Sequence, residues 1–177
     1  MLLCIDDANV EAIRRLVEYY PIDGVSTNPT IISRTKREPF EVLKEIREII
    51  GSERELFAQV LATEADGMLA DAKRIIKELG DNTIVKIPCT TEGFKAMKMC
   101  HKEGIRLLGT AIYTPMQGFI AAKCGCEYLA PYVNRIDNTL FIKWRMLHSG
   151  GRPIIKFNIR VSDLTGTVLY EKIRIVR

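Results

Sequence analysis

The chain has 177 residues, of which 47% are hydrophobic and 27% charged, the composition of a globular domain with a substantial core. No apolar run approaches the roughly 20 residues of a membrane-spanning helix. The short apolar start ends in Asp6 and Asp7, without a basic segment or a cleavage site. We therefore expect neither a membrane span nor a signal peptide. The protein is expected to be cytoplasmic.

The net charge of +4 is unevenly distributed. Residues 1–139 contain 18 basic and 20 acidic side chains, a net charge of −2, whereas residues 140–177 contain 8 basic and 2 acidic ones, a net charge of +6. The main body thus lacks the basic surface of a nucleic-acid-binding protein, and the last segment differs from it in composition.

The five cysteines form an odd set without a CxxC pair. The spacing of Cys124 and Cys126 is too tight for a zinc site, and His101 and His148 supply no matching ligand pair. We expect reduced cysteines, mostly in the core, and no metal centre.

Strand-like and helix-like patterns alternate six times along the first 137 residues. The expected strands are 2–5, 24–29, 56–61, 83–88, 107–112 and 128–133. The expected helices are about 9–19, 40–50, 63–80, 91–103 and 114–125. This alternation predicts an α/β fold with parallel strands, either a (β/α) barrel or a doubly wound sheet. No phosphate-binding glycine loop follows a strand, which argues against a nucleotide-binding sheet.

Lys86 lies within the apolar segment 83–88, Thr-Ile-Val-Lys-Ile-Pro. A buried lysine is rare unless it is paired or functional, and desolvation favours its neutral amine, a nucleophile toward carbonyl carbons. The alternative is a lysine at a strand end whose stem is packed and whose amine is in water. The segment alone does not decide between them.

A polar residue recurs near the end of each predicted strand. The six are Asp6, Asn28, Gln59, Lys86, Thr110 and Tyr132. Each has a structural explanation of its own, as a helix cap, a turn residue or a hydrogen-bonded core group. Their repetition at one place in the βα unit favours a site, because catalytic groups of a barrel project from the C-terminal ends of its strands.

Several segments resemble the transaldolase family. They are Val25–Thr30, Phe57–Val60, Val85–Pro88, Gly109–Ala111 and Ala130–Asp137. The resemblance covers about residues 1–137 and is strongest to the small bacterial branch with fructose-6-phosphate aldolase. It implies a (β/α)8 TIM-type barrel that acts on sugar phosphates through a lysine Schiff base, without metal or organic cofactor, and forms homo-oligomers. Nucleic acid and membrane are not expected partners.

The resemblance also assigns roles. It makes Lys86 the Schiff-base lysine, Asp6 the acid that handles substrate hydroxyls and protons, and Thr110 a ligand of a catalytic water. Asn28 and Ser26 correspond to sugar-binding positions, and Arg135 corresponds to a phosphate-binding arginine.

Gln59 and Tyr132 discriminate within the family, because transaldolases resemble one another in having Glu at the first position and lack the tyrosine. Enamine chemistry needs a proton donor and acceptor near the Schiff base. Tyr132, alone or through a water held by Gln59 and Thr110, can serve in place of a carboxylate. The pattern favours an aldolase that joins or cleaves a hydroxyketone and glyceraldehyde 3-phosphate. A transaldolase and a non-catalytic remnant of the family are the alternatives.

After Asp137 the sequence departs from the family pattern. The resemblance leads us to expect a seventh strand with a phosphate-binding serine, an eighth strand and C-terminal helices, and residues 138–177 match none of these. Their alternation of apolar and basic residues predicts one or two strands, and residues 153–155 are the candidate for the seventh barrel strand. A solvated, partly disordered tail, a nucleic-acid arm and a frameshifted or recombined end are the other interpretations. We therefore divide the chain into a barrel domain, 1–137, and an atypical basic segment, 138–177, and expect an incomplete barrel.

Overall fold

The computed structural model describes residues 3–132 and three later strands, 143–149, 152–162 and 168–176. The first part consists of six βα-type units in chain order. Its strands are β1 (Cys4–Asp6), β2 (Gly24–Ser26), β3 (Glu55–Gln59), β4 (Thr83–Pro88), β5 (Leu107–Ile112) and β6 (Tyr128–Pro131). Its helices are α1 (Val10–Tyr19), α2 (Pro29–Ser33), α3 (Pro39–Ile50), α4 (Ala65–Leu79), α5 (Thr91–Lys102) and α6 (Pro115–Lys123).

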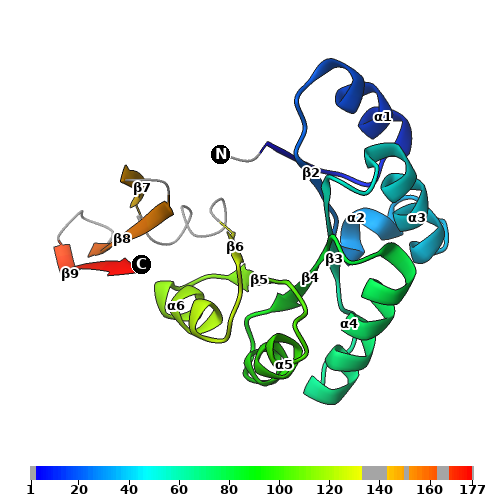
Figure 1. Cartoon of the computed structure of the whole chain (residues 1–177). Coiled ribbons are helices and arrows are strands. Elements are labelled where there is room, and N and C mark those ends of the chain that lie inside the picture. Colours follow the sequence, from blue (N-terminus) through cyan, green and yellow to red (C-terminus); the bar gives the residue numbers. More distant parts are fainter. Residues whose placement is uncertain (1–2, 133–142, 150–151, 163–167, 177) are drawn as a thin grey trace.

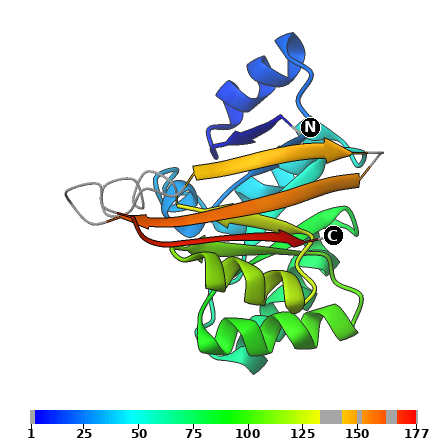
Figure 2. The same cartoon turned by 90° about the vertical axis from the view of Figure 1, so that its left-hand side faces the viewer.

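The six strands form one parallel sheet in the order β1-β2-β3-β4-β5-β6. The sheet curls, and the helices cover its convex side (Figure 1). Figure 2 shows the first unit, in blue, and the last units, in green to yellow, at opposite margins. The fold is therefore an incomplete TIM-type barrel, as the sequence predicted, and the doubly wound alternative is wrong, because all six helices lie on one face.

Alternation along the strands builds two apolar clusters on the two faces of this sheet. The larger one packs the convex side against the helices, with Val25, Ala58 and Val85 among its fully buried members. A small cluster of Phe57 and Ile84, with Leu108, occupies the concave side. Because side chains alternate between faces with a period of two, the same alternation carries Lys86, two residues after Ile84, onto the concave face.

Two local features were not predicted from the sequence. The short helix α2 follows Asn28, whose Oδ1 accepts a hydrogen bond from the Ile31 amide at 3.0 Å. The ladder between β5 and β6 shifts register between Gly109 and Ile112, and Ala111 between them has φ 54°. This left-handed residue reverses the alternation, so that Ile112 packs into the convex cluster.

The C-terminal segment forms a second, separate sheet from β7 (Lys143–Ser149), β8 (Arg152–Ser162) and β9 (Val168–Val176). Neighbouring strands in this sheet are antiparallel. The sequence led us to expect one or two strands here, and the structure has three. The candidate seventh barrel strand is wrong: residues 153–155 belong to β8, which pairs with β7 and β9 instead of β6. The described part of this segment is also not an irregular tail, since its period-two pattern is satisfied by strand pairing.

All five cysteines are free. Burial raises the pKa of Cys89 to about 12 and that of Cys100 to about 11, so both thiols remain protonated at neutral pH and behave as small core residues. Among the described residues, no three or more His, Cys, Asp or Glu side chains are grouped so as to hold a metal ion. Nor is any helix in the described ranges long and apolar enough to cross a membrane.

Two helical glycines test how tightly the helices pack on this sheet. A Cβ on Gly93 would lie 1.8 Å from the Pro88 carbonyl oxygen, whereas one on Gly118 would meet its nearest atom, on Leu129, at 3.8 Å. We expect Gly93→Ala to lower the free energy of unfolding by about 3 kcal/mol, because the backbone must move. Gly118→Ala, the matched control, should raise it by about 0.5–1 kcal/mol through helix propensity. Urea unfolding measures both; equal effects would contradict the packing.

Candidate active site

Lys86 reaches across the concave face of the sheet. Its side chain is 5% exposed, and its Nζ donates to Ser26 Oγ at 2.9 Å and to the Thr27 carbonyl oxygen at 2.7 Å. These acceptors belong to β2 and the residue after it, and β3 lies between β2 and β4. The amine therefore spans one strand, and the solvated-amine alternative is wrong.

The electrostatics of Lys86 combine two opposed effects. Burial lowers its pKa, because the ammonium form loses its hydration, and the charge of Asp6 partly opposes this by raising the same pKa. A lysine with a lowered pKa has a larger neutral fraction near neutral pH. Such an amine is the form that attacks carbonyl carbons.

The parallel register brings three more predicted site residues to the same face. Asp6 pairs with Ser26 between β1 and β2, and Gln59 pairs with Lys86 between β3 and β4. Partners in a parallel ladder point to the same side of the sheet. The partner of Ser26 on β3 is Phe57, so the pair of Gln59 and Lys86 lies two residues further along the strands than the pair of Asp6 and Ser26. The hydrogen bond from Lys86 to Ser26 joins the two pairs, and we call these four residues, at the C-terminal ends of four strands, the polar row.

Thr110 extends this row onto β5. It is 3% exposed and pairs with Pro88 at the end of β4. Its carbonyl oxygen accepts a hydrogen bond from the Cys89 amide at 2.8 Å, so the backbone of Thr110 is fixed against the chain that leaves β4. The left-handed Ala111 follows directly, and backbone conformations of this kind are concentrated at functional sites.

Tyr132 lies just after β6 and is 37% exposed. Its amide donates to the Ile112 carbonyl oxygen at 3.1 Å, and its ring packs edge-on against Tyr113, with the centroids 5.3 Å apart. The tyrosine is therefore held at the C-terminal end of the sheet, the end at which the polar row lies.

The two remaining predicted residues, Asn28 and Arg135, are not part of the polar row. Asn28 caps α2 through its Oδ1, so a contact with a sugar would use its Nδ2. Arg135 lies outside the described residues, and its phosphate-binding role stays a prediction.

Thr27 is the contributor that residue-by-residue reading of the sequence missed. It is fully buried, and its Oγ1 donates to the Phe57 carbonyl oxygen at 3.0 Å while its own carbonyl accepts from Lys86. A backbone carbonyl carries no side-chain signature. The position of Thr27 between Ser26 and Asn28 was the one available signal.

A hollow of about 580 Å³ opens at the C-terminal ends of β3 and β4. Gln59, Pro88 and Glu92 are among the residues that line it. Because Gln59 is the ladder partner of Lys86 and also lines this hollow, the hollow lies beside the polar row, on the side of the loops that follow β3 and β4.

A half-barrel with a buried lysine among polar strand ends defines a protein of the TIM-barrel class. Solved structures agree on the fold. The chain superimposes on 2,3-dimethylmalate lyase, a member of the PEP mutase/isocitrate lyase superfamily, with a TM-score of 0.53 and 9% identity. It superimposes on an aldolase called QR15 with a TM-score of 0.53 and 14% identity.

These matches also measure how much of a barrel is present. In each, 74% of this chain is covered, and it spans 56% of the lyase and 68% of QR15. The model of the transaldolase/fructose-6-phosphate aldolase family matches residues 3–152, so the chain belongs to this family. The match extends beyond Asp137, where the resemblance in the sequence ended.

Asp6 tests the electrostatics of the site. Replacing its carboxylate by Asp6→Asn removes the charge that raises the pKa of Lys86. We expect the Lys86 titration, followed through its ¹³Cε shift by NMR and assigned with Lys86→Met, to move to lower pH. Asp66→Asn, on α4, is the control and should leave it unchanged. An unmoved midpoint in Asp6→Asn would show that the two groups do not interact.

Lys86 also links stability to pH. Since its folded pKa is lowered, the unfolded chain binds a proton that the folded chain lacks, between that pKa and the ordinary value of about 10.4. The free energy of unfolding should therefore rise with pH across this window, relative to Lys86→Met. Urea unfolding at a series of pH values measures the difference. A difference that falls as pH rises would contradict the lowered pKa.

Proposed function

We propose that this chain carries the catalytic half-site of a class I aldolase of the fructose-6-phosphate aldolase type. The reaction joins or cleaves a small hydroxyketone and glyceraldehyde 3-phosphate. The observation that supports it best is the buried amine of Lys86, hydrogen-bonded to Ser26 and Thr27 at the C-terminal end of β4. Membership of the family is consistent with this chemistry.

The first step uses the neutral amine. Its nitrogen lone pair forms a bond to the ketone carbon of the donor, and the carbonyl oxygen takes a proton, which gives a carbinolamine. Loss of that oxygen as water leaves an iminium between Lys86 and the donor. We assign to Asp6, whose charge acts on Lys86, the role of accepting the proton that the nitrogen releases and of returning one to the leaving oxygen.

The second step removes a proton from the carbon next to the iminium. The electron pair of that C–H bond forms the enamine, and the enamine carbon then adds to the aldehyde carbon of the acceptor, whose oxygen takes up a proton. We assign the proton transfers to Tyr132, with a water held between Gln59 and Thr110. Hydrolysis of the product iminium restores the Lys86 amine and releases the sugar phosphate.

Substrate positioning completes the proposal. Ser26 and Asn28, at the end of β2, are assigned to the hydroxyl groups of the donor, and Arg135 to the phosphate of the acceptor. Gln59 and Tyr132 favour the aldolase over the transaldolase, because the neutral amide at the end of β3 leaves proton transfer to the tyrosine.

Trapping tests the nucleophile directly. Borohydride reduces an iminium to a stable amine, so parent protein incubated with dihydroxyacetone should gain the mass of the reduced donor on the peptide that contains Lys86. Lys86→Met should lose this adduct, because it has no amine at that position. Lys77→Met, on the exposed side of α4, is the control and should trap like the parent. Equal trapping by Lys86→Met would refute the mechanism.

Tyr132→Phe separates imine formation from proton transfer. The variant should still trap dihydroxyacetone, while exchange of the donor α-proton with D₂O, measured by NMR, falls by a factor of about 10²–10⁴, the usual contribution of a general acid–base group. Tyr113→Phe, which keeps the ring that packs on Tyr132, is the matched control. Undiminished exchange in Tyr132→Phe would remove the tyrosine from the mechanism.

A further inference from the structure

The exposed large hydrophobic side chains are concentrated in the first and last units of the half-barrel. Of eight such residues in the described part, all but Leu61 come from these units. They are Leu3, Tyr19 and Tyr20 in the first unit, Tyr113, Met116 and Phe119 in the loop and helix that follow β5, and Tyr132 just after β6, the last strand of this sheet. Exposed apolar groups that gather in this way mark an interaction surface.

Helix α6 shows the pattern most clearly. Gly118 and Ala121 are buried on one side, against the sheet, while Met116 and Phe119 are 63% and 37% exposed. Residues three apart share a helix face, so α6 presents a second apolar face away from the sheet. A helix that is apolar on both sides is one that has packed neighbours on both sides.

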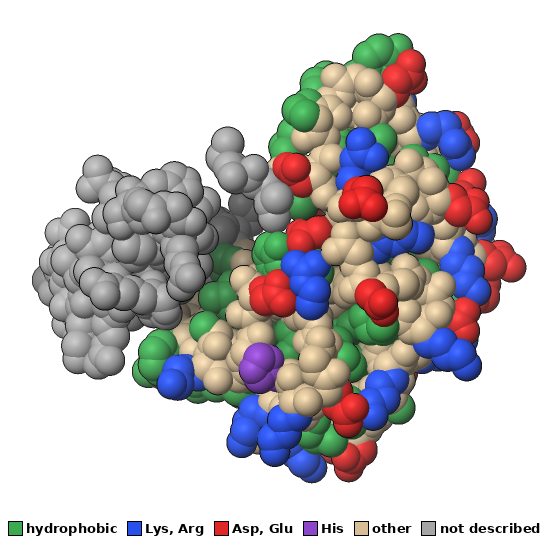
Figure 3. Space-filling model, in the orientation of Figure 1, with side chains coloured by type: hydrophobic (Ala, Val, Ile, Leu, Met, Phe, Trp, Pro, Cys, Tyr) green, Lys and Arg blue, Asp and Glu red, His purple; other side chains and the backbone are tan. Residues whose placement is uncertain are grey.

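Figure 3 shows the same distribution on the face that it draws. Hydrophobic side chains gather at the outer end of α1 and over α6, whereas Lys, Arg, Asp and Glu are spread over α3, α4 and α5. Helix α1 carries exposed Lys, Arg, Asp or Glu side chains beside its hydrophobic end, whereas α6 has a single charged residue, Lys123. The lack of charge is therefore clearest at the margin formed by α6.

The sheet is open at the same two margins. Within the described six-stranded sheet, β1 pairs with β2 alone and β6 with β5 alone. An edge of this kind presents backbone N–H and C=O groups to an added strand. A barrel of this class closes with eight strands, so two parallel strands would pair with both edges and close the ring.

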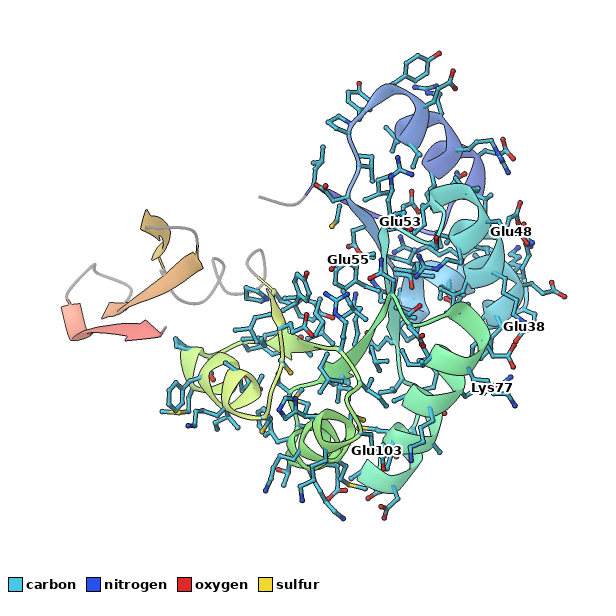
Figure 4. All side chains as sticks on the ribbon, in the orientation of Figure 1. Glu38, Glu48, Glu53, Glu55, Lys77 and Glu103 are labelled. Carbon is cyan, nitrogen blue, oxygen red and sulfur yellow. The ribbon has the colours of Figure 1, made fainter. Side chains whose placement is uncertain are left out.

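A buried carboxylate oxygen is a second indication that further strands pack against this sheet. Glu55 lies on the concave side of β3, away from Glu38, Glu48 and Lys77 on the helix side (Figure 4). Its Oε1 accepts from Arg106 Nη2 at 2.8 Å and from the Tyr128 hydroxyl at 2.7 Å, but its buried Oε2 has no partner among the described residues. A donor side chain on a closing strand would satisfy this oxygen across the barrel interior.

We propose that the two margins form one surface, the closing surface, that binds a (βα)2 segment: two parallel strands, each followed by a helix. One strand pairs with β6 and the other with β1, one helix covers Met116 and Phe119, and the other packs beside α1. A second copy of this chain fits less well, because it brings six strands where two complete the ring. The binding itself is independent of the proposed function, which enters only through the trapping readout below.

The test mixes the 177-residue chain with a separately produced peptide of the last two βα units of a full-length aldolase of this family. We expect a 1:1 complex by sedimentation velocity. Amide hydrogen exchange should slow by about tenfold or more in β1 and β6, the edge strands, while that in β3 and β4 changes little. No complex, or protection that omits both edge strands, would overturn the proposal.

A matched pair of variants locates the surface. Met116→Asp with Phe119→Asp places two charges on the exposed face of α6 and should weaken binding at least about tenfold, because charge is desolvated at the contact. Leu61→Asp, exposed but at neither margin, should bind like the parent. Circular dichroism checks that both fold. Equal weakening by both variants would overturn the proposal, as would a homodimer of the chain alone that the α6 charges dissociate.

The outcomes separate binding from chemistry. A complex that gives no borohydride adduct on Lys86 would sink the proposed function and leave the closing surface standing. An adduct in the chain alone, with no complex at any peptide concentration, would overturn the closing surface and support the proposed function.

Discussion

The candidate site depends on one hydrogen bond, from the Lys86 amine to the Thr27 carbonyl oxygen at 2.7 Å. A buried amine must find acceptors, and this one finds them only by crossing β3 to the end of β2. Thr27 is held in turn by its hydroxyl and amide, which both donate to the Phe57 carbonyl oxygen at 3.0 Å. The register of three parallel strands is thus what places the Lys86 amine, and a slip of one residue would turn Lys86 into the helix layer.

At the opposite, N-terminal end of the sheet, the polar contacts are structural. Arg47 donates hydrogen bonds to the backbone carbonyl oxygens of Gly51, Arg54, Leu79 and Asn82 and to the Thr83 hydroxyl. These acceptors surround the N-terminal ends of β3 and β4, so one guanidinium fixes the chain where both strands begin. Stability is thereby built at the N-terminal ends, which leaves the C-terminal ends available for polar groups that pack less well. This is the arrangement expected of a barrel enzyme.

The sequence pattern was sufficient to predict parallel strands covered by helices, because buried parallel strands are continuous apolar runs between amphipathic helices. The choice of a barrel over a doubly wound sheet rested on the resemblance to the family. It was insufficient where the signal was short or belonged to the backbone. Helix α2 has five residues, too few for a periodic pattern, and Asn28 before Pro29 read equally well as a turn. The left-handed Ala111 and the carbonyl of Thr27 have no signature in residue type. The C-terminal strands could be predicted from the alternation of apolar and basic residues, but their pairing partners could not. A period-two pattern shows which residues share a face of a strand and does not show which strand lies next to it.

The distribution of the site over the strands bears on what an incomplete barrel can do. Asp6, Ser26, Gln59, Lys86 and Thr110 belong to β1 through β5, so the hydrogen bonds and charges that act on the amine need no seventh or eighth strand. Closure affects other properties: how far water reaches the concave face, and whether Glu55 Oε2 finds a donor. In the proposed mechanism, iminium formation, which tolerates water, therefore depends on the described strands alone. Carbon–carbon bond formation competes with hydrolysis of the iminium and benefits from a closed, drier interior. In the proposed mechanism the two steps therefore differ in what they need, because the contacts of the Lys86 amine are complete in the six-stranded sheet and the enclosure of the concave face is not.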